Sequence, residues 1–329
     1  MSIDTPDEEE TTAPLSELEL VDIPPGDEIA SVPDDYRFGY IAIVGRPNVG
    51  KSTLLNRLVG QKVSITAHKP QTTRHQILGI HSTPSYQVVY VDTPGIHRGR
   101  RKAINRYMNR AATSAIEGVE AVVFVVEALQ WTPEDEHIRR RLQSVERPVV
   151  LVPNKVDRIT DKPTLLPYLA QFAEWDEFAD VVPISARRGL NVDRLETLLA
   201  GYLPGGPPQF SMEQLTDRSE RFLTAEIVRE KLTRRLGQEL PYQLTVEVEQ
   251  FEVTEKITHI SALIWVERKG HKNIVIGKNG HLLRDIGHDA RVDMEVLLQT
   301  KVFLRLWVKV REGWSDDEKA LRTLGYEAI

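Results

Sequence analysis

The 329-residue sequence contains no cysteine. Disulfides, thiolate metal sites and cysteine nucleophiles are therefore excluded. The sequence also has no uninterrupted apolar run close to the roughly 20 residues of a membrane-spanning helix, and no basic start with an apolar core that resembles a signal peptide. These absences lead us to expect a cytoplasmic location.

Basic residues are missing from the first 36 positions, which hold twelve Asp or Glu and no Lys or Arg. The segment has repeated prolines and no sustained helical or strand period, so we expect residues 1–36 to be a disordered acidic tail. We expect this tail to be solvated. The functional alternative is that it mimics the charge of RNA and competes with RNA for a basic surface. The rest of the chain has 42 basic and 36 acidic residues, about +6 in formal charge, which permits an anionic partner without requiring one.

Residues 37–205 alternate apolar runs with amphipathic segments. The runs IAIVG, YQVVYVD, AVVFVVEA, PVVLVPNK and VVPIS consist almost entirely of apolar side chains. Such runs are typical of parallel strands that are buried on both faces. We predict an α/β domain with a mostly parallel, doubly covered sheet. Ligands bind such sheets at the carboxyl ends of the strands, and the polar motifs of this region fall at those ends.

The first motif is G-x-x-x-x-G-K-S at residues 45–52, between the run IAIV and the helical segment STLLNRLVG. Its glycines let consecutive backbone N–H groups turn inward around phosphate oxygens. Lys51 adds charge near the β- and γ-phosphates, and Ser52 offers a hydroxyl to Mg²⁺. The predicted phosphate-binding residues are Gly45, Arg46, Pro47, Asn48, Val49, Gly50, Lys51, Ser52 and Thr53.

Two further segments suit Mg²⁺ and the γ-phosphate. Directly after YQVVYV stand Asp92, Thr93, Pro94 and Gly95. Asp92 is expected to hold Mg²⁺ through water, and the Gly95 N–H is expected to meet the γ-phosphate. The Thr-rich segment before QILGI should supply a mobile threonine that closes on the ion, with Thr73 the first candidate and Thr72 the second. The predicted metal ligands are Ser52, Thr73 and Asp92.

Two further loops suit a guanine base. Asn154-Lys155-Val156-Asp157 follows PVVLVP, and Ser185-Ala186 follows DVVPI. The Asp157 carboxylate can accept hydrogen bonds from the ring N–H and the exocyclic amine of guanine, an edge that adenine lacks. Asn154 should brace the loop, the Lys155 stem should pack on the base, and the Ala186 N–H should meet the guanine carbonyl. The four motifs in this order predict a GTP-binding domain.

The segment PGGPPQF marks a composition break, and we expect a linker at residues 206–216. The pattern of residues 217–329 is helix-strand-strand-helix-helix-strand, with Gly277-Lys278-Asn279-Gly280 between two helical stretches. This is the layout of a type II K-homology (KH) RNA-binding domain of α+β class, in which the glycines let the backbone approach a single strand. Because residues 210–329 hold nineteen basic and twenty acidic side chains, RNA binding requires a local patch. Its candidates are Arg268, Lys269, Lys272, Lys278, Asn279 and Arg284.

The segments GRPNVGKSTLLN, KPQTTRHQILGI, YVDTPGIH, PISARRGLNVD and TDRSERF resemble the bacterial Era family over about residues 37–326. The resemblance implies a GTPase that switches between GTP and GDP with Mg²⁺. It further implies binding to the 3′ end of small-subunit (16S) ribosomal RNA and a role in 30S subunit assembly. The alternative is a binding module that signals at the inner membrane or in cell-cycle control, with incidental hydrolysis. A third alternative is an ATP-dependent RNA-processing enzyme. The motif N-K-V-D speaks against it, because Asp157 matches an edge of guanine that adenine lacks.

A water-orienting glutamine is missing after D-T-P-G, where Ile96 and His97 stand. An apolar Ile96 cannot orient water, so we expect slow intrinsic hydrolysis. The resemblance implies that Asn48 helps to coordinate K⁺, which would place positive charge where an arginine finger acts. Arg74 and His97 are lower-ranked candidates to supply the missing interaction, because each is expected at the surface or facing RNA. The predicted catalytic residues are Lys51, Thr73 and Asn48.

Overall fold

The computed structural model describes residues 33–67, 69, 72–95, 103–237, 240–324 and 326. Most of the expected acidic tail, residues 1–36, lies outside the described residues. So do Ile96 and His97, the residues that follow the D-T-P-G motif. Within the described ranges, no helix combines the length and the apolar character needed to cross a membrane.

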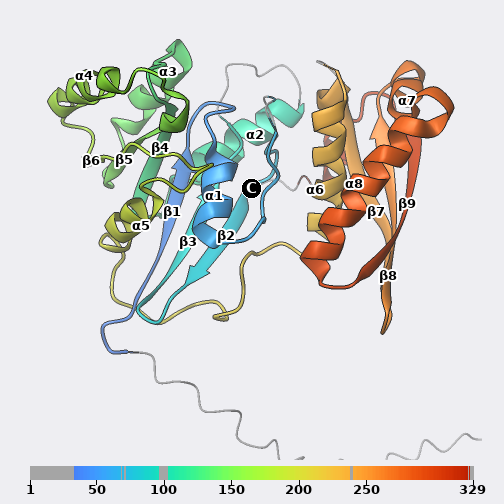
Figure 1. Ribbon diagram of the computed structural model, residues 1–329, viewed down its shortest axis with the longest axis horizontal. Helices are drawn as coiled ribbons and strands as arrows, with labels where there is room; N and C mark the ends of the chain where they lie inside the picture. Colours follow the sequence, from blue (N-terminus) through green and yellow to red (C-terminus); the bar gives the residue numbers. More distant parts are fainter. Residues whose placement is uncertain are drawn as a thin grey trace, which may run out of the picture. The chain divides into compact units, whose positions relative to one another are not determined.

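A six-stranded sheet has the strand order β2-β3-β1-β4-β5-β6 (Figure 1). Strand β2 runs antiparallel to β3, and all the other neighbouring pairs are parallel. The mostly parallel sheet predicted from the apolar runs is confirmed. The strands are β1 (Arg37–Val44), β2 (Ile77–Ser82), β3 (Tyr86–Asp92), β4 (Ala121–Glu127), β5 (Val149–Asn154) and β6 (Asp180–Val181).

Helices cover both faces of this sheet because successive strand side chains point to opposite sides. Ile41 and Val123 pack in one core with α1 and α5, whereas Ala42 and Phe124 pack in a second core with α2 and α3. This arrangement explains why the strands have almost no polar side chains. The helices are α1 (Lys51–Val59), α2 (Ala103–Ser114), α3 (Pro133–Leu142), α4 (Leu165–Ala170) and α5 (Val192–Ala200).

The last strand is shorter than the run VVPIS predicts. Strand β6 comprises only Asp180–Val181, although the Val182 and Ile184 N–H groups beyond it still donate to the Leu151 and Pro153 carbonyls of β5 at 2.9 and 2.8 Å. Ser185 and Ala186 therefore do not continue directly from a strand. They lie in a turn in which the Ser185 N–H donates to the Leu190 carbonyl at 3.1 Å.

A second sheet has the order β7-β8-β9, with α6 and α8 on one of its faces (Figure 1). Strand β8 runs antiparallel to β7 and parallel to β9. Its core includes Leu232, Ile264, Ile286 and Met294, all fully buried. The predicted helix-strand-strand-helix-helix-strand order is confirmed. The elements are α6 (Glu220–Arg235), β7 (Leu244–Val253), β8 (Ile257–Val266), α7 (Lys269–Ile276), α8 (His281–Leu298), β9 (Lys301–Val310) and a short α9 (Glu318–Thr323).

The expected linker at 206–216 lies along the first sheet. The Gln87 side-chain carbonyl accepts the N–H groups of Gln209 and Phe210 at 2.9 and 3.0 Å. The Ile80 N–H donates to the Leu215 carbonyl at 2.9 Å. These bonds fix the segment to β2 and β3, and the domain limits 37–205 and 217–329 stay predictions.

Candidate functional site

The chain turns tightly between β1 and α1. Gly45 and Gly50 have φ angles of +154° and +107°. A Cβ on Gly45 would lie 2.4 Å from the carbonyl oxygen of Val125, and a Cβ on Gly50 would lie 2.3 Å from Asn154 Nδ2. Both positions therefore require glycine, which has no Cβ and tolerates positive φ.

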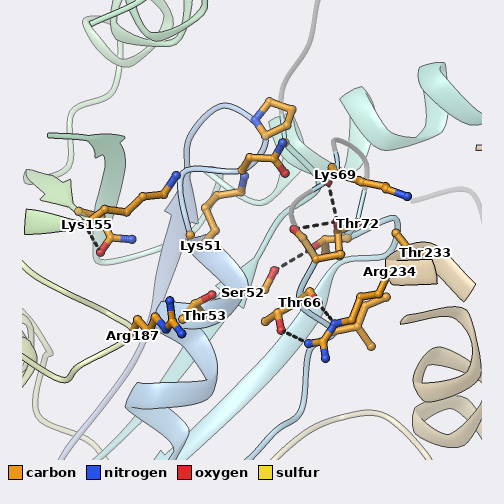
Figure 2. A pocket seen from close by; sticks show the side chains of 18 of the residues that line it. Lys51, Ser52, Thr53, Thr66, Lys69, Thr72, Lys155, Arg187, Thr233 and Arg234 are labelled. Carbon is orange, nitrogen blue, oxygen red and sulfur yellow. Dashed lines mark hydrogen bonds between the residues drawn. The ribbon is translucent and has the colours of Figure 1, made fainter. Parts of the chain in front are cut away.

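Lys51 is the first residue of α1 and its ammonium is held inside this turn (Figure 2). Its Nζ donates to the carbonyl oxygens of Gly45 at 2.9 Å and Arg46 at 3.1 Å, and the residue is only 6% exposed. Burial lowers the pKa of Lys51 to about 8. A buried ammonium beside a helix N-terminus is well placed for a phosphate anion.

Three oxygen-bearing side chains meet near Lys51. Ser52 Oγ lies 2.8 Å from Asp92 Oδ2 and 2.7 Å from Thr73 Oγ1. Asp92 is fully buried, burial raises the pKa of its carboxyl, and its Oδ1 has no hydrogen-bond partner among the described residues. An unpartnered buried carboxylate oxygen beside two hydroxyls fits Mg²⁺, a hard cation that also takes ligands from phosphate and water.

The groups predicted to select the base lie in two adjoining loops. Asn154 Nδ2 donates to the Val49 carbonyl at 2.8 Å, and its Oδ1 accepts the Ala186 N–H at 3.0 Å. Asn154 therefore joins the phosphate loop to the loop after β6. The Ser185 hydroxyl donates to Asp157 Oδ1 at 2.6 Å, and this bond lowers the pKa of the Asp157 carboxyl. Asp157 is thus an oriented, ionised acceptor.

A cavity of about 540 Å³ is lined both by residues of the phosphate loop and by residues of the predicted base loop (Figure 2). Of the predicted nucleotide residues, those that line it are Pro47, Asn48, Gly50, Lys51, Ser52, Thr53, Thr72, Thr73, Gly95, Asn154, Lys155 and Asp157. Those that do not line it are Gly45, Arg46, Val49, Asp92, Thr93, Pro94, Ser185 and Ala186. The Arg46 guanidinium pairs instead with Asp135 at 3.0 Å, so its side chain is already engaged.

The predicted RNA loop joins α7 to α8. Gly277, Asn279 and Gly280 all have positive φ, and a Cβ on Gly277 would lie 2.6 Å from the Cβ of Leu282. Lys278 and Asn279 are exposed at its tip. Of the other predicted RNA residues, Arg268, Lys269 and Arg284 are exposed and Lys272 is half-buried. The loop is accessible to a sugar-phosphate chain, with Lys278 supplying charge.

Comparison with known proteins assigns the two halves of the chain. A family model described as a 50S ribosome-binding GTPase matches residues 40–155, and a KH-domain model matches residues 239–315. GTPase Era of Pseudomonas aeruginosa is 56% identical over 295 residues, which cover 90% of this chain and 97% of that protein. GTPase Era of Azotobacter vinelandii is 56% identical over 290 residues, 88% of this chain and 97% of that protein.

The chain belongs to the Era family of GTPases.

Solved Era structures share its fold. A crystal structure of Era in complex with MgGDPNP and nucleotides 1506–1542 of 16S ribosomal RNA has a TM-score of 0.85 at 37% identity. The aligned region covers 88% of this chain and 99% of the Era chain in that crystal structure. A variant of Aquifex aeolicus Era bound to GDP·AlF₄⁻ gives the same values. The predicted family and fold, a P-loop GTPase domain followed by a KH domain, are confirmed, and so is the GTPase activity.

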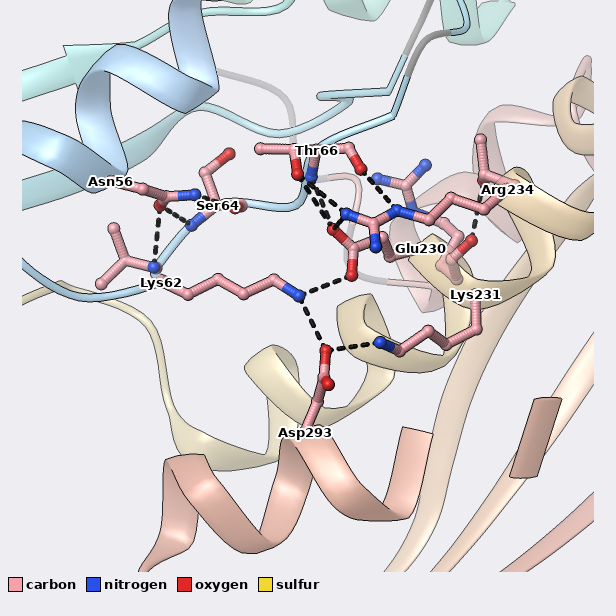
Figure 3. Close-up of polar contacts among 11 residues, drawn as sticks. Asn56, Lys62, Ser64, Thr66, Glu230, Lys231, Arg234 and Asp293 are labelled. Carbon is pink, nitrogen blue, oxygen red and sulfur yellow. Dashed lines mark hydrogen bonds and ion pairs between the residues drawn. The ribbon is translucent and has the colours of Figure 1, made fainter. Parts of the chain in front are cut away.

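Hydrogen bonds and an ion pair join the threonine-rich segment, between α1 and β2, to helix α6 (Figure 3). Lys62 Nζ lies 2.5 Å from Glu230 and 2.9 Å from Asp293 of α8. The Thr66 N–H donates to Glu230 at 2.9 Å, and Arg234 donates to the Thr66 carbonyl at 3.0 Å. Glu230 is fully buried, and removing it would leave the Thr66 N–H without this acceptor, whereas Lys62 would keep Asp293.

Arg74 is not a surface residue, which corrects the sequence-based expectation. It is 1% exposed, and its guanidinium donates to the Leu244 carbonyl at 2.8 Å and the Pro241 carbonyl at 2.7 Å. Both carbonyls belong to the KH-domain half of the chain. The segment that contains Thr73 is therefore anchored on both sides, because Arg229 of α6 also donates to the Thr72 carbonyl.

Several residues that line the cavity are not among the site residues predicted from the sequence. Thr66 and Lys69 lie in the threonine-rich segment, Arg187 follows the predicted Ala186, and Thr233 and Arg234 come from α6. The adjacency of Arg187 to a predicted site residue was an available signal. Nothing local in the sequence of α6 indicates that it lines this cavity, because that contact depends on the tertiary fold.

His75 supplies a pH-dependent contribution to stability. It is 5% exposed, its ring stacks on Tyr326 at 4.4 Å between centroids, and burial lowers its pKa to about 3. The unfolded chain, with a His pKa near 6.5, binds the proton more readily, so stability falls as pH falls below about 6.5. Between pH 7 and pH 5 the wild type should lose about 2 kcal/mol of unfolding free energy more than His75→Phe. Urea denaturation at both pH values measures this difference, and parallel losses in the two proteins would contradict it.

Proposed function

We propose that this chain is a GTP-driven RNA-binding switch that acts on the 3′ end of small-subunit ribosomal RNA during 30S assembly in the cytoplasm. The observation that carries the nucleotide part is the meeting of Lys51, Ser52, Thr73 and Asp92 beside a cavity that Asp157 also lines. The RNA part draws on the Era relative solved with 16S ribosomal RNA and on the exposed loop Gly277–Gly280.

In this proposal Ser52, Thr73 and Asp92 hold Mg²⁺, which supplies charge neutralisation for the phosphates. Lys51 donates to the β- and γ-phosphates. Asn154 keeps the base loop against the phosphate loop, and Asp157 accepts the guanine N–H groups. Bonds from Glu230, Arg234 and Arg229 to the threonine-rich segment give the nucleotide site a route to the KH domain.

The proposal assigns Asn48 a role in holding K⁺ near the transferring phosphate. Asn48 lines the cavity and has a φ angle of +67°, in the left-handed region that Asn tolerates better than most residues. GTP turnover should be about tenfold faster in KCl than in NaCl at equal ionic strength, and Asn48→Ala should lose this difference. Equal wild-type rates in the two salts would exclude the K⁺ role.

The RNA loop can be tested without disturbing the nucleotide site. Lys278→Asp combined with Asn279→Asp places two like charges beside an RNA phosphate, so affinity for single-stranded RNA of the small-subunit 3′ end should fall at least tenfold. GTP affinity should not change, because neither residue lines the cavity. Filter binding measures the RNA affinity, and an unchanged value would place the RNA site elsewhere.

A further inference from the structure

Strand β9 carries an alternating basic and aromatic stripe on one side. Successive side chains of a strand point to opposite faces, so the odd-numbered residues share one face. The even-numbered ones face the helices: Val302 and Val308 are buried, and Leu306 lies against Gly287 of α8. The residues on the opposite, outer face form what we call the β9 stripe: Lys301, Phe303, Arg305, Trp307 and Lys309.

The two aromatic rings of the β9 stripe are unusually open. Phe303 and Trp307 are 43% and 45% exposed. They are four residues apart, about 13 Å along a strand, so they can contact separate groups of one extended ligand. The Arg305 guanidinium lies 5.0 Å from the centroid of the Phe303 ring, which leaves its charge on the same outer face.

Charge divides this outer face by strand. On β7, Glu247 accepts from the indole N–H of Trp265 at 2.9 Å, and Glu249 lies 3.7 Å from Lys309. Strands β7 and β9 form the two edges of the sheet, since the order is β7-β8-β9. The acidic side chains therefore lie at the β7 edge and the cationic ones at the β9 edge, where Lys301 and Arg305 are exposed.

The edge strand also borders the predicted RNA loop. Strand β9 packs against both α7 and α8, the helices that the loop Gly277–Gly280 joins. A single strand of RNA that leaves the loop reaches the β9 stripe by passing over one strand edge. Interleaved rings and cations suit a polyanion with stackable bases, whereas lysine is depleted at the centre of protein–protein interfaces.

We propose that the β9 stripe is a second single-stranded RNA site, which extends the contact beyond the Gly277–Gly280 loop. Bases stack on Phe303 and Trp307, and phosphates lie at Lys301, Arg305 and Lys309. This inference rests on the RNA binding proposed above for the same domain. It adds that the domain holds a longer stretch of RNA than its loop alone contacts.

The test compares a short single-stranded RNA that binds the loop with the same RNA extended by about eight uridines at either end. Fluorescence anisotropy with the full chain gives both affinities. Extension should tighten wild-type binding about tenfold, and Phe303→Ser with Trp307→Ser should remove that gain. Lys301→Glu with Arg305→Glu, at exposed positions, should remove the gain as well and reduce its salt dependence.

Two control variants separate the outcomes. Val292→Ser with Val296→Ser removes exposed apolar side chains from α8 and should keep the full gain, as should Arg194→Glu on α5. The proposed function is tested by the loss of short-RNA binding in the variant Lys278→Asp with Asn279→Asp. The β9 stripe is tested only by the gain in affinity when the RNA is extended. No gain in the wild type, or a gain that survives both stripe variants, would overturn the inference. Stripe variants that bind extended RNA normally but lose a ribosomal protein would also overturn it.

Discussion

Replacing Asp157 by Asn should lower the affinity for GDP by roughly a hundredfold or more and raise the affinity for xanthosine diphosphate. The carboxylate is positioned by the Ser185 hydroxyl at 2.6 Å, and its lowered pKa keeps it ionised at neutral pH. An amide at this position would turn an N–H group toward the guanine amine, leaving two donors opposed. Xanthine has a carbonyl at that place and can accept the new donor.

Titration calorimetry with both nucleotides measures this exchange of preference. Asp161→Asn, an exposed carboxylate near the same loop but outside the cavity lining, is the matched control and should retain guanine preference. A loss of GDP affinity without any gain for xanthosine diphosphate would show that Asp157 stabilises the loop and does not read the base.

Lys51 should make nucleotide binding fall with rising pH. Its pKa of about 8 means that the ammonium becomes neutral above that pH in the free protein. Bound phosphates raise the pKa of this group, so binding above pH 8 takes up a proton and affinity falls about tenfold per pH unit. Between pH 7 and pH 9 the affinity for GDP should decrease about tenfold.

Lys51→Arg provides the control for this prediction, because a guanidinium stays charged over the whole range. Its affinity at pH 7 is expected to be lower, since a guanidinium does not fit the space that holds Nζ against Gly45 and Arg46. Its affinity should nevertheless vary little between pH 7 and pH 9. The same slope in both proteins would assign the pH dependence to another group.

The sequence predicts the two folds and the nucleotide site because the signals are local. The spacing of Gly45, Gly50 and Lys51 is an intrinsic requirement of a tight loop, and the apolar runs reflect burial on both faces. The apolar run at β6 predicts a longer strand than Asp180–Val181, because Val182 and Ile184 continue the hydrogen bonding to β5 beyond the regular strand.

Arg74 and α6 show what the sequence does not predict. A charged residue in a polar segment is normally exposed, yet Arg74 is buried because carbonyls 167 and 170 residues away accept its guanidinium N–H groups. The sequence predicts that Glu230 lies on the charged, exposed face of an amphipathic helix. In the structure it is fully buried and accepts hydrogen bonds from Thr66. These positions depend on which elements meet in the tertiary fold.

We expect the bound nucleotide to set the affinity of the chain for RNA. The most direct measurement is the dissociation constant of single-stranded small-subunit 3′-end RNA from the full chain, with Mg²⁺ and either a non-hydrolysable GTP analogue or GDP. RNA binding should be at least about tenfold tighter with the GTP analogue, because the threonine-rich segment lines the cavity and also bonds to α6. Equal dissociation constants in the two states would contradict it.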